Sequence, residues 1–136
     1  MLADPLHPSI QPKTLCLNLS GTLIDTDFII GKGMTLKRRP FLNQFLSKLS
    51  QMYEIIIFTD DDYIFLSGLI PVLDPRQQIF MGAFGRECMV WHQGSYIKDP
   101  KYLNRDLKNV IFIDRDIENV KKSPYNAIIL KEFHGE

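Results

Sequence analysis

The sequence predicts an α/β fold with a central, mainly parallel sheet flanked by helices and a small β-hairpin insertion. Apolar runs recur at 15–19, 54–59, 110–113 and 127–130, and segments with helical spacing separate several of them. Runs without polar alternation are typical of parallel strands that are buried on both faces. The chain has 136 residues, of which 45% are hydrophobic, so it is large enough for one domain with a core.

The N-terminal half begins with an expected irregular arm over 1–13, which holds Pro5, Pro8 and Pro12 and has no apolar periodicity. We expect a single domain over 14–136. Its first strand is the apolar run 15–19. Residues 40–49 have apolar side chains at helical spacing and predict a helix with Pro40 in its first turn.

Two strands and a helix are expected in the middle of the chain. The run 54–59 predicts the second strand, and 79–84 predicts a further one. Between them, 63–73 predicts a helix that is bent or interrupted near Gly68 and Pro71, because proline removes a helix hydrogen bond.

The C-terminal half contains the expected insertion. Residues 88–91 and 95–98 flank the turn sequence His-Gln-Gly and predict a β-hairpin. The runs 110–113 and 127–130 predict the last two strands of the sheet. The only tryptophan, Trp91, and the methionines are assigned to packing.

Composition excludes some classes of function. The 16 basic and 16 acidic side chains cancel, which predicts no affinity for nucleic acid or lipid from whole-molecule charge. The basic run 37–39 has no interleaved aromatic residues and is expected to be a solvated strand exit. Cys16 and Cys88 lie in apolar runs and are expected to be buried and unpaired. No stretch approaches the roughly 20 apolar residues of a membrane span.

Polar residues follow three of the predicted strands, at 18–22, 59–62 and 114–116. Ligands of open parallel sheets bind beyond the carboxyl ends of the strands. The three segments are therefore the first candidates for a functional site.

These strand ends resemble those of the haloacid-dehalogenase-like phosphatases. Within that family, they are most similar to the branch that contains the polymerase C-terminal-domain phosphatases. The resemblance rests on "NLSGT", "FT" and "IKD…FID", with Asp114 at the sixteenth position after Lys98. It implies that Asn18 and Ser20 replace a nucleophilic and an acid/base aspartate. The matching pocket positions are Asn18, Ser20, Thr22, Thr59, Lys98 and Asp114.

The replacements remove the chemistry of such a phosphatase. The Asn18 amide is neutral and its nitrogen lone pair is delocalised, so it is no nucleophile. The Ser20 hydroxyl has a pKa far above neutral and is a poor proton donor. Because carboxylates set the affinity for Mg²⁺, we expect weak magnesium binding at most and no cofactor. The chain is predicted to be a pseudophosphatase.

Two alternatives remain open. The first is an active phosphatase of phosphoserine-containing proteins that uses Asp25 or Asp27 as substitute acids, although these follow Ser20 by five and seven residues. The second is a phosphopeptide-binding module that uses Thr59 and Lys98 to hold the phosphate. An ordinary strand exit would also explain the first segment alone, but the order and spacing of all three favour the phosphatase-like fold.

The chain resembles one family of this branch more closely, the Tim fifty presequence receptors of the mitochondrial inner-membrane translocase. The matching stretches are "KRRPFLNQFLSKLSQMYEIIIFT", "VLDP", "YIKDPKYLNRDLKNVIFID", "PYNAIIL" and "FHGE". The resemblance implies a non-catalytic receptor that faces the intermembrane space and binds cationic amphipathic presequences and the channel-forming subunit. Attachment to the membrane is expected only through a segment absent from this chain.

A presequence receptor needs acids beside exposed apolar side chains. The acids expected at one edge of the sheet are Asp60, Asp61, Asp62, Asp116 and Glu118, and we expect no bound cation to neutralise this edge. The apolar partners are expected to be Phe28, Ile29 and Ile30 on a mobile glycine-flanked loop, or Tyr63 and Phe65. Alternatively, the aspartates only begin a helix and 28–30 belongs to the core.

Overall fold

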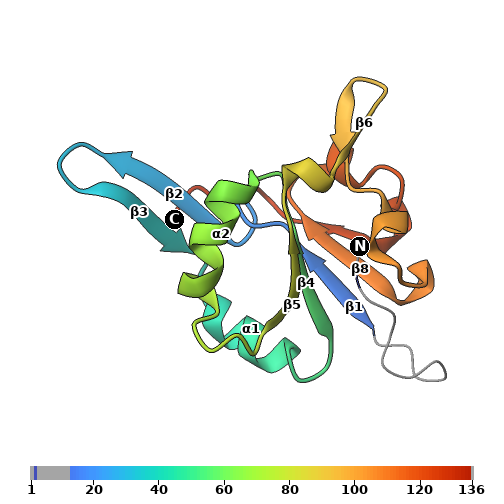
Figure 1. Ribbon diagram of the computed structural model, residues 1–136, viewed down its shortest axis with the longest axis horizontal. Coiled ribbons are helices and arrows are strands. Elements are labelled where there is room, and N and C mark those ends of the chain that lie inside the picture. Colours follow the sequence, from blue (N-terminus) through green and yellow to red (C-terminus); the bar gives the residue numbers. More distant parts are fainter. Residues whose placement is uncertain (1, 3–12, 136) are drawn as a thin grey trace.

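The computed structural model describes Leu2 and residues 13–135, which places the expected arm over 1–13 almost wholly outside the described residues. Its centre is a sheet of order β5-β4-β1-β8-β9 in which all neighbouring strands are parallel (Figure 1). The strands are β1 (Thr14–Leu17), β4 (Glu54–Phe58), β5 (Phe80–Phe84), β8 (Val110–Asp114) and β9 (Ala127–Ile129). The predicted parallel sheet and its five strands are confirmed.

Two α-helices pack against this sheet, α1 (Leu42–Leu49) and α2 (Tyr63–Leu73). Pro40 lies before α1 rather than in its first turn, and Phe41 forms the N-cap with a φ of 68°. The predicted interruption of α2 is wrong, because the helix continues through Gly68 and Pro71. Pro71 is close to the C-terminal end of α2, so the hydrogen bond that it removes affects only the last turn.

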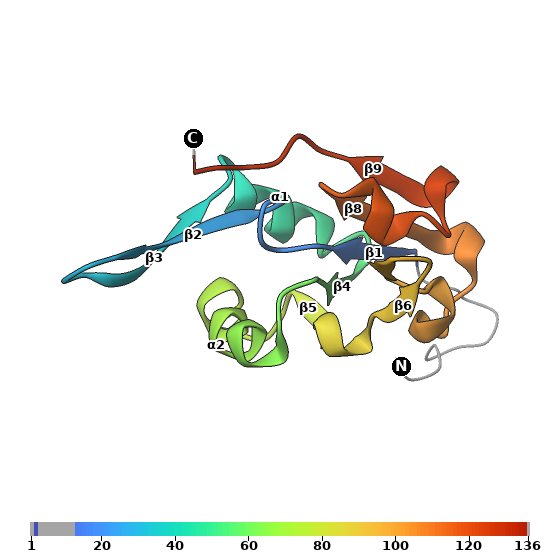
Figure 2. The ribbon, with the colours of Figure 1, turned by 90° about the horizontal axis from the view of Figure 1, so that it is seen from above.

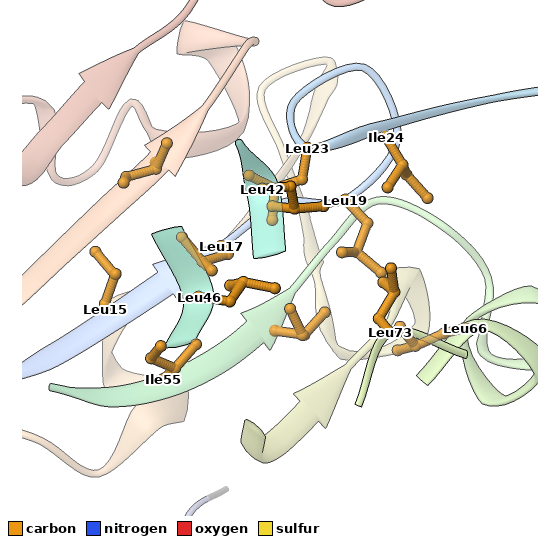
Figure 3. Close-up of a cluster of buried hydrophobic side chains, with 12 residues drawn as sticks. Leu15, Leu17, Leu19, Leu23, Ile24, Leu42, Leu46, Ile55, Leu66 and Leu73 are labelled. Carbon is orange, nitrogen blue, oxygen red and sulfur yellow. The ribbon is translucent and has the colours of Figure 1, made fainter. Parts of the chain in front are cut away.

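The sheet separates two apolar clusters, as expected when alternate side chains of a strand point to opposite faces. Leu15, Leu17 and Ile55 belong to one cluster with Leu46 of α1 and Leu66 of α2 (Figure 3). On the other face, the buried side chains are Cys16, Ile56, Phe58, Met89, Leu103, Val110, Phe112 and Val120. Burial raises the pKa of the Cys16 thiol. Both cysteines are free, as the sequence predicts, but Cys88 is half-buried rather than buried.

Two β-hairpins extend from the sheet. The predicted insertion is confirmed as β6 (Val90–His92) and β7 (Ser95–Ile97), joined through Gln93 and Gly94, which have φ values of 49° and 84°. Positive φ at both positions is typical of a two-residue hairpin turn. The other hairpin, β2 (Ile24–Ile29) and β3 (Gly33–Arg38), replaces the expected loop around 28–30. The two hairpins lie far apart (Figures 1 and 2).

Short 3₁₀ helices connect the remaining strands: η1 (Arg86–Cys88), η2 (Pro100–Leu103), η3 (Leu107–Asn109), η4 (Ile117–Val120) and η5 (Pro124–Asn126). Lys37 and Arg38 end β3, as expected for a solvated strand exit. The next residue, Arg39, forms hydrogen bonds within the protein. Its side chain donates to the carbonyls of Thr22 (2.6 Å) and Lys131 (2.8 Å). Across the described part of the chain, no helix combines the length and the apolar character that a membrane span needs.

The loop after α2 is organised by Asp74, which is only 3% exposed. Its carboxylate accepts hydrogen bonds from the backbone N–H groups of Gln78, Ile79 and Phe80, all at 3.0 Å. Burial raises the pKa of Asp74, but these three bonds outweigh burial and hold the pKa below its ordinary value of 3.8. The "VLDP" stretch therefore fixes the entry into β5.

Replacing Asp74 by Asn is expected to lower the free energy of unfolding by about 1–3 kcal/mol at pH 7, because an amide places a donor against a backbone donor. The folded-state pKa of Asp74 is lowered, so its stabilisation is present above the ordinary pKa and is lost as the pH falls through the folded value. Urea unfolding at pH 7 and pH 3 measures this. Asp27→Asn, at an exposed position of β2, is the control. An equal loss at both pH values would contradict the assignment.

Candidate functional site

The carboxyl ends of β1, β4 and β8 meet at one edge of the sheet because these strands are neighbours. Five of the six predicted pocket residues are buried there, with at most 1% of each exposed: Asn18, Thr22, Thr59, Lys98 and Asp114. Lys98 follows β7, and its side chain extends to this edge of the sheet. Ser20 is half-buried in the loop after β1. The sequence thus predicted residues that the fold brings together.

Asn18 is the centre of this cluster. Its amide oxygen accepts from Lys98 Nζ (2.9 Å) and from the backbone N–H of Asp60 (3.2 Å). Its amide nitrogen donates to the Ser20 carbonyl and to Thr22 Oγ1, both at 3.0 Å. The side chain therefore uses its donors and its acceptor within the fold, in an arrangement that a carboxylate at this position cannot reproduce.

Thr59 contacts the same amide oxygen at 3.1 Å, but its hydroxyl lies closer to Asp61 Oδ2, at 2.6 Å. A hydroxyl carries one proton, so Thr59 donates it to the Asp61 carboxylate. The Thr59 oxygen in turn accepts from the backbone N–H of Leu19 (3.2 Å). The hydroxyl predicted to hold a phosphate is thereby engaged by the protein.

Lys98 and Asp114 form a buried ion pair, with 2.5 Å between Nζ and Oδ2 and 1% of each side chain exposed. Burial lowers the pKa of Lys98, and the Asp114 carboxylate opposes that shift. The second Asp114 oxygen accepts from the backbone N–H groups of Arg115 (2.8 Å) and Asp116 (3.1 Å). Both oxygens of the predicted metal-holding acid are thus occupied by protein donors.

Arg115 was not singled out by the sequence, although it is the main cation at the mouth of this cluster. Its guanidinium lies 2.8 Å from Asp60 Oδ2, 3.6 Å from Asp114 Oδ1 and 3.5 Å from Glu132 Oε1. Burial lowers its pKa, but the hydrogen bond and the charge of Asp60 dominate and raise it. The edge that was expected to be acidic therefore also holds two cationic side chains, Arg115 and Lys98.

The Arg115 side chain packs over Gly21, the glycine of the first phosphatase-like motif. A Cβ on Gly21 would lie 2.4 Å from Arg115 Cδ, and Gly21 has a φ of 78°. The left-handed backbone conformation therefore favours glycine here, and a Cβ would in addition displace the Arg115 side chain. Nothing in the spacing of the sequence marks the arginine that fills this place.

The residues at this edge do not fit a magnesium ion, the metal that the resemblance implies. Magnesium needs free oxygen ligands, at least one of them a carboxylate. Asp114 and the Asn18 oxygen are committed to Lys98 and to backbone donors. Among Leu2 and 13–135, no cluster of three or more acids, histidines or cysteines is placed to hold a metal.

The predicted acidic run after β4 has structural partners. Asp61 Oδ2 accepts from the backbone N–H of Ser20 (3.1 Å), and Asp62 caps α2 by accepting from the N–H of Phe65 (2.8 Å). The prediction that these aspartates begin a helix is correct for Asp62. Asp61 instead connects the loops that follow β1 and β4.

Three of the predicted acids, Asp60, Asp116 and Glu118, line one cavity of about 390 Å³ beside the β6–β7 hairpin. Trp91 and Tyr96 of the hairpin also line it. The assignment of Trp91 to packing is wrong, because 65% of it is exposed. The methionines are mixed: Met89 is buried, whereas Met34, Met52 and Met81 are exposed.

The predicted apolar residues lie elsewhere. Phe28 and Ile29 end β2, and Ile30 begins the turn that follows; Phe28 is 74% and Ile30 is 92% exposed. They are therefore neither core nor part of the acidic cavity. Tyr63 is 62% exposed at the start of α2, and Phe65 is half-buried.

Comparison with known proteins identifies the family. The family model described as NLI interacting factor-like phosphatase matches residues 13–136. This chain belongs to that family. Its members are phosphatase-like by description.

Two curated relatives of this NLI interacting factor-like chain are subunits of the mitochondrial import inner membrane translocase. The chain is 37% identical over 136 residues to the subunit tim50 of Neurospora crassa, and 34% identical over 137 residues to TIM50 of Homo sapiens. The matches cover 100% and 99% of this chain, but the chain spans only 25% and 38% of those relatives. The predicted resemblance to this translocase family is confirmed.

Solved structures support the fold of this NLI interacting factor-like chain. The RNA polymerase II CTD phosphatase Fcp1 matches with a TM-score of 0.76 and 20% identity, over 90% of this chain and 42% of that one. A beryllium-fluoride-bound Fcp1 variant from fission yeast matches with a TM-score of 0.75. At this identity the likeness shows the shared fold, which confirms the predicted haloacid-dehalogenase-like architecture.

Proposed function

We propose that this chain is a non-catalytic domain of a mitochondrial import inner-membrane translocase subunit, and that it binds presequences. The observation that carries the proposal is Asn18, which stands at the nucleophile position and donates both of its amide hydrogens within the fold. A neutral, fully bonded amide cannot attack phosphorus. The identity to TIM50 subunits supports the translocase and its location at the mitochondrial inner membrane.

We further propose that the domain works without a cofactor and binds Mg²⁺ weakly at most. The support is the commitment of Asp114 and Asn18 to protein donors. Within this fold, Lys98 serves to neutralise Asp114 and to orient the Asn18 amide. The edge acts as a structural centre that holds the loops after β1, β4 and β8 together.

The alternative of an active phosphatase has less support. Asp25 and Asp27 lie on β2, in a hairpin that leads away from the central sheet (Figure 1). Asp25 lies opposite Lys37 and Asp27 lies opposite Thr35 in the register of this hairpin, so the strand carries both acids away from the position of Ser20. A phosphopeptide module has little support too, because Lys98 is buried and paired and Thr59 is bonded to Asp61.

The experiment that tests the proposed function is fluorescence anisotropy with a labelled basic amphipathic peptide. A composition-matched scrambled peptide is the control for bulk charge. We expect selective binding that weakens between low and moderate salt, because exposed charges are screened over about 10 Å at 0.1 M. Equal binding of the two peptides, or no binding, would overturn the presequence-receptor function.

We propose that the exposed tip of the β2–β3 hairpin contacts the second expected partner, the channel-forming subunit in the intermembrane space. Phe28 and Ile30 present apolar surface at this tip, and exposed apolar patches commonly mark protein contacts. The β2–β3 hairpin lies far from the β6–β7 hairpin, beside which the acidic cavity opens, and this supports separate contacts for the two partners (Figure 2).

The double variant Phe28→Ser, Ile30→Ser is expected to lose capture by the channel-forming subunit, while its free energy of unfolding changes by no more than about 0.5 kcal/mol, because both side chains are exposed. Pull-down with the purified subunit and urea unfolding measure the two quantities. Met52→Ser, at another exposed apolar position, is the matched control. Unchanged capture by the double variant would rule out the hairpin tip.

A further inference from the structure

The cavity beside the β6–β7 hairpin combines aromatic and acidic walls. Trp91 and Tyr96 are directly opposite in the hairpin and meet edge to face, with ring centroids 5.1 Å apart. They remain 65% and 47% exposed, although the same hairpin buries Ile97 completely. Two large aromatic side chains are thus held in fixed positions at the mouth of a cavity of about 390 Å³.

The opposite wall comes from the segment that follows β8. Asp116 caps η4 by accepting from the N–H of Glu118 (2.9 Å), and Glu118 contacts Ser95 Oγ at 3.3 Å and Lys121 Nζ at 3.5 Å. Asp60 and Arg86 complete the charged lining. Asp60 is paired with Arg115, and Arg86 donates through Nε to the Asp60 carbonyl (2.8 Å). Asp60 and Glu118 thus have cationic partners in Arg115 and Lys121, and Asp116 is the acid of this lining without an ion pair among the described residues.

A separate observation points to a ligand. Asn119 lines the cavity and is 7% exposed, and its side-chain nitrogen has no hydrogen-bond partner among the described residues. A buried amide donor without an acceptor is destabilising. The nitrogen itself is covered by protein atoms, so a peptide carbonyl in the cavity would supply the missing acceptor once the Asn119 side chain turns toward the cavity.

We propose that this cavity is the subsite that takes a lysine or arginine side chain of a presequence. Glu118 and Asp116 attract the cationic head, Trp91 and Tyr96 contact its stem and charge, and Asn119 donates to a carbonyl of the same peptide. The assignment rests on the proposed presequence binding and locates the peptide contact in this cavity. The peptide then contacts Trp91 and Tyr96 of the β6–β7 hairpin and does not contact Phe28, Ile29 and Ile30.

Trp91 is the only tryptophan in the chain, so its emission reports directly on this cavity. The experiment titrates the unaltered chain with a basic amphipathic peptide free of tryptophan and follows emission and peptide anisotropy together. A second peptide replaces each Lys and Arg by Gln. We expect the emission to change with the same midpoint as the anisotropy for the basic peptide, and the Gln peptide to leave it unchanged.

Two variants test the walls of the cavity. Trp91→Ala and Glu118→Gln are each expected to weaken binding of the basic peptide by about tenfold, since a desolvated cation–π contact or a charge-assisted bond is of that order. Tyr125→Ala, at a fully exposed aromatic, and Asp27→Asn, at an exposed acid of β2, are the matched controls. The controls are expected to bind within twofold of the unaltered chain.

The outcomes distinguish a failure of the proposed subsite from a failure of presequence binding as a whole. Anisotropy that reports binding while the Trp91 emission stays constant, or binding by both variants within twofold, would overturn the subsite and leave presequence binding intact. Absence of binding by anisotropy would overturn both. Parallel changes in emission and anisotropy, with weakened binding by both variants, would support the subsite.

Discussion

Replacing Lys98 by Met is expected to lower the free energy of unfolding by about 3–5 kcal/mol, because it leaves Asp114 as a buried charge without its partner. Both side chains are 1% exposed, so water cannot replace the lost ammonium group. The same change removes a donor from the Asn18 oxygen, at 2.9 Å in the unaltered chain. Urea unfolding followed by far-UV circular dichroism measures the loss.

A second variant separates the charge from the packing. Lys98→Met combined with Asp114→Asn removes both charges, and is expected to recover a large part of the loss since no uncompensated charge remains. Lys101→Met, at an exposed lysine of η2, is the control for loss of a positive charge alone. A loss below about 1 kcal/mol in Lys98→Met would contradict the buried pair.

Replacing Asn18 by Leu is expected to lower the free energy of unfolding by about 3–4 kcal/mol. The change keeps the size of the side chain but leaves the Ser20 carbonyl, the Thr22 hydroxyl and the Asp60 N–H without their partner. All of these groups lie at a buried edge where unmade hydrogen bonds are costly. Chemical unfolding measures the effect, and Asn43→Leu, at an exposed position of α1, is the control.

The companion variant Asn18→Asp asks whether magnesium binding can be restored. Without metal, the new carboxylate faces the Ser20 carbonyl, so we expect a lower melting temperature than that of the unaltered chain. With Mg²⁺ we expect the variant to regain several degrees, because binding to the folded state stabilises it. The unaltered chain is expected to change by less than about 1 °C. A rise of several degrees in the unaltered chain on addition of Mg²⁺ would contradict the poor fit of this edge for magnesium.

The sheet was predictable because its strands are continuous apolar runs that end in polar residues. The β2–β3 hairpin was not, since Ile24–Ile29 begins with polar alternation and ends in exposed apolar residues, a pattern that does not separate a solvated strand from a loop. Pro71 was misleading for a different reason: near the end of a helix, proline removes only one bond of the last turn.

The candidate site was predictable as far as it follows from strand order. Asn18 and Thr59 follow β1 and β4, and Asp114 ends β8; these strands are neighbours in the sheet, so the meeting of the three residues depends on topology. Arg115 and Trp91 could not be assigned in this way. Their roles depend on the direction in which a side chain leaves a loop or a hairpin, and neither residue spacing nor composition carries that direction.

A measurement of phosphate release tests most directly whether this phosphatase-like domain lacks phosphatase activity. The unaltered chain, at high concentration and with Mg²⁺, is incubated with an aryl phosphate and with a phosphoserine peptide, beside a Lys98→Met sample as a check for contaminating phosphatase. We predict release no faster than that of the buffer with either substrate. Turnover by the unaltered chain that disappears in Lys98→Met would contradict the non-catalytic function.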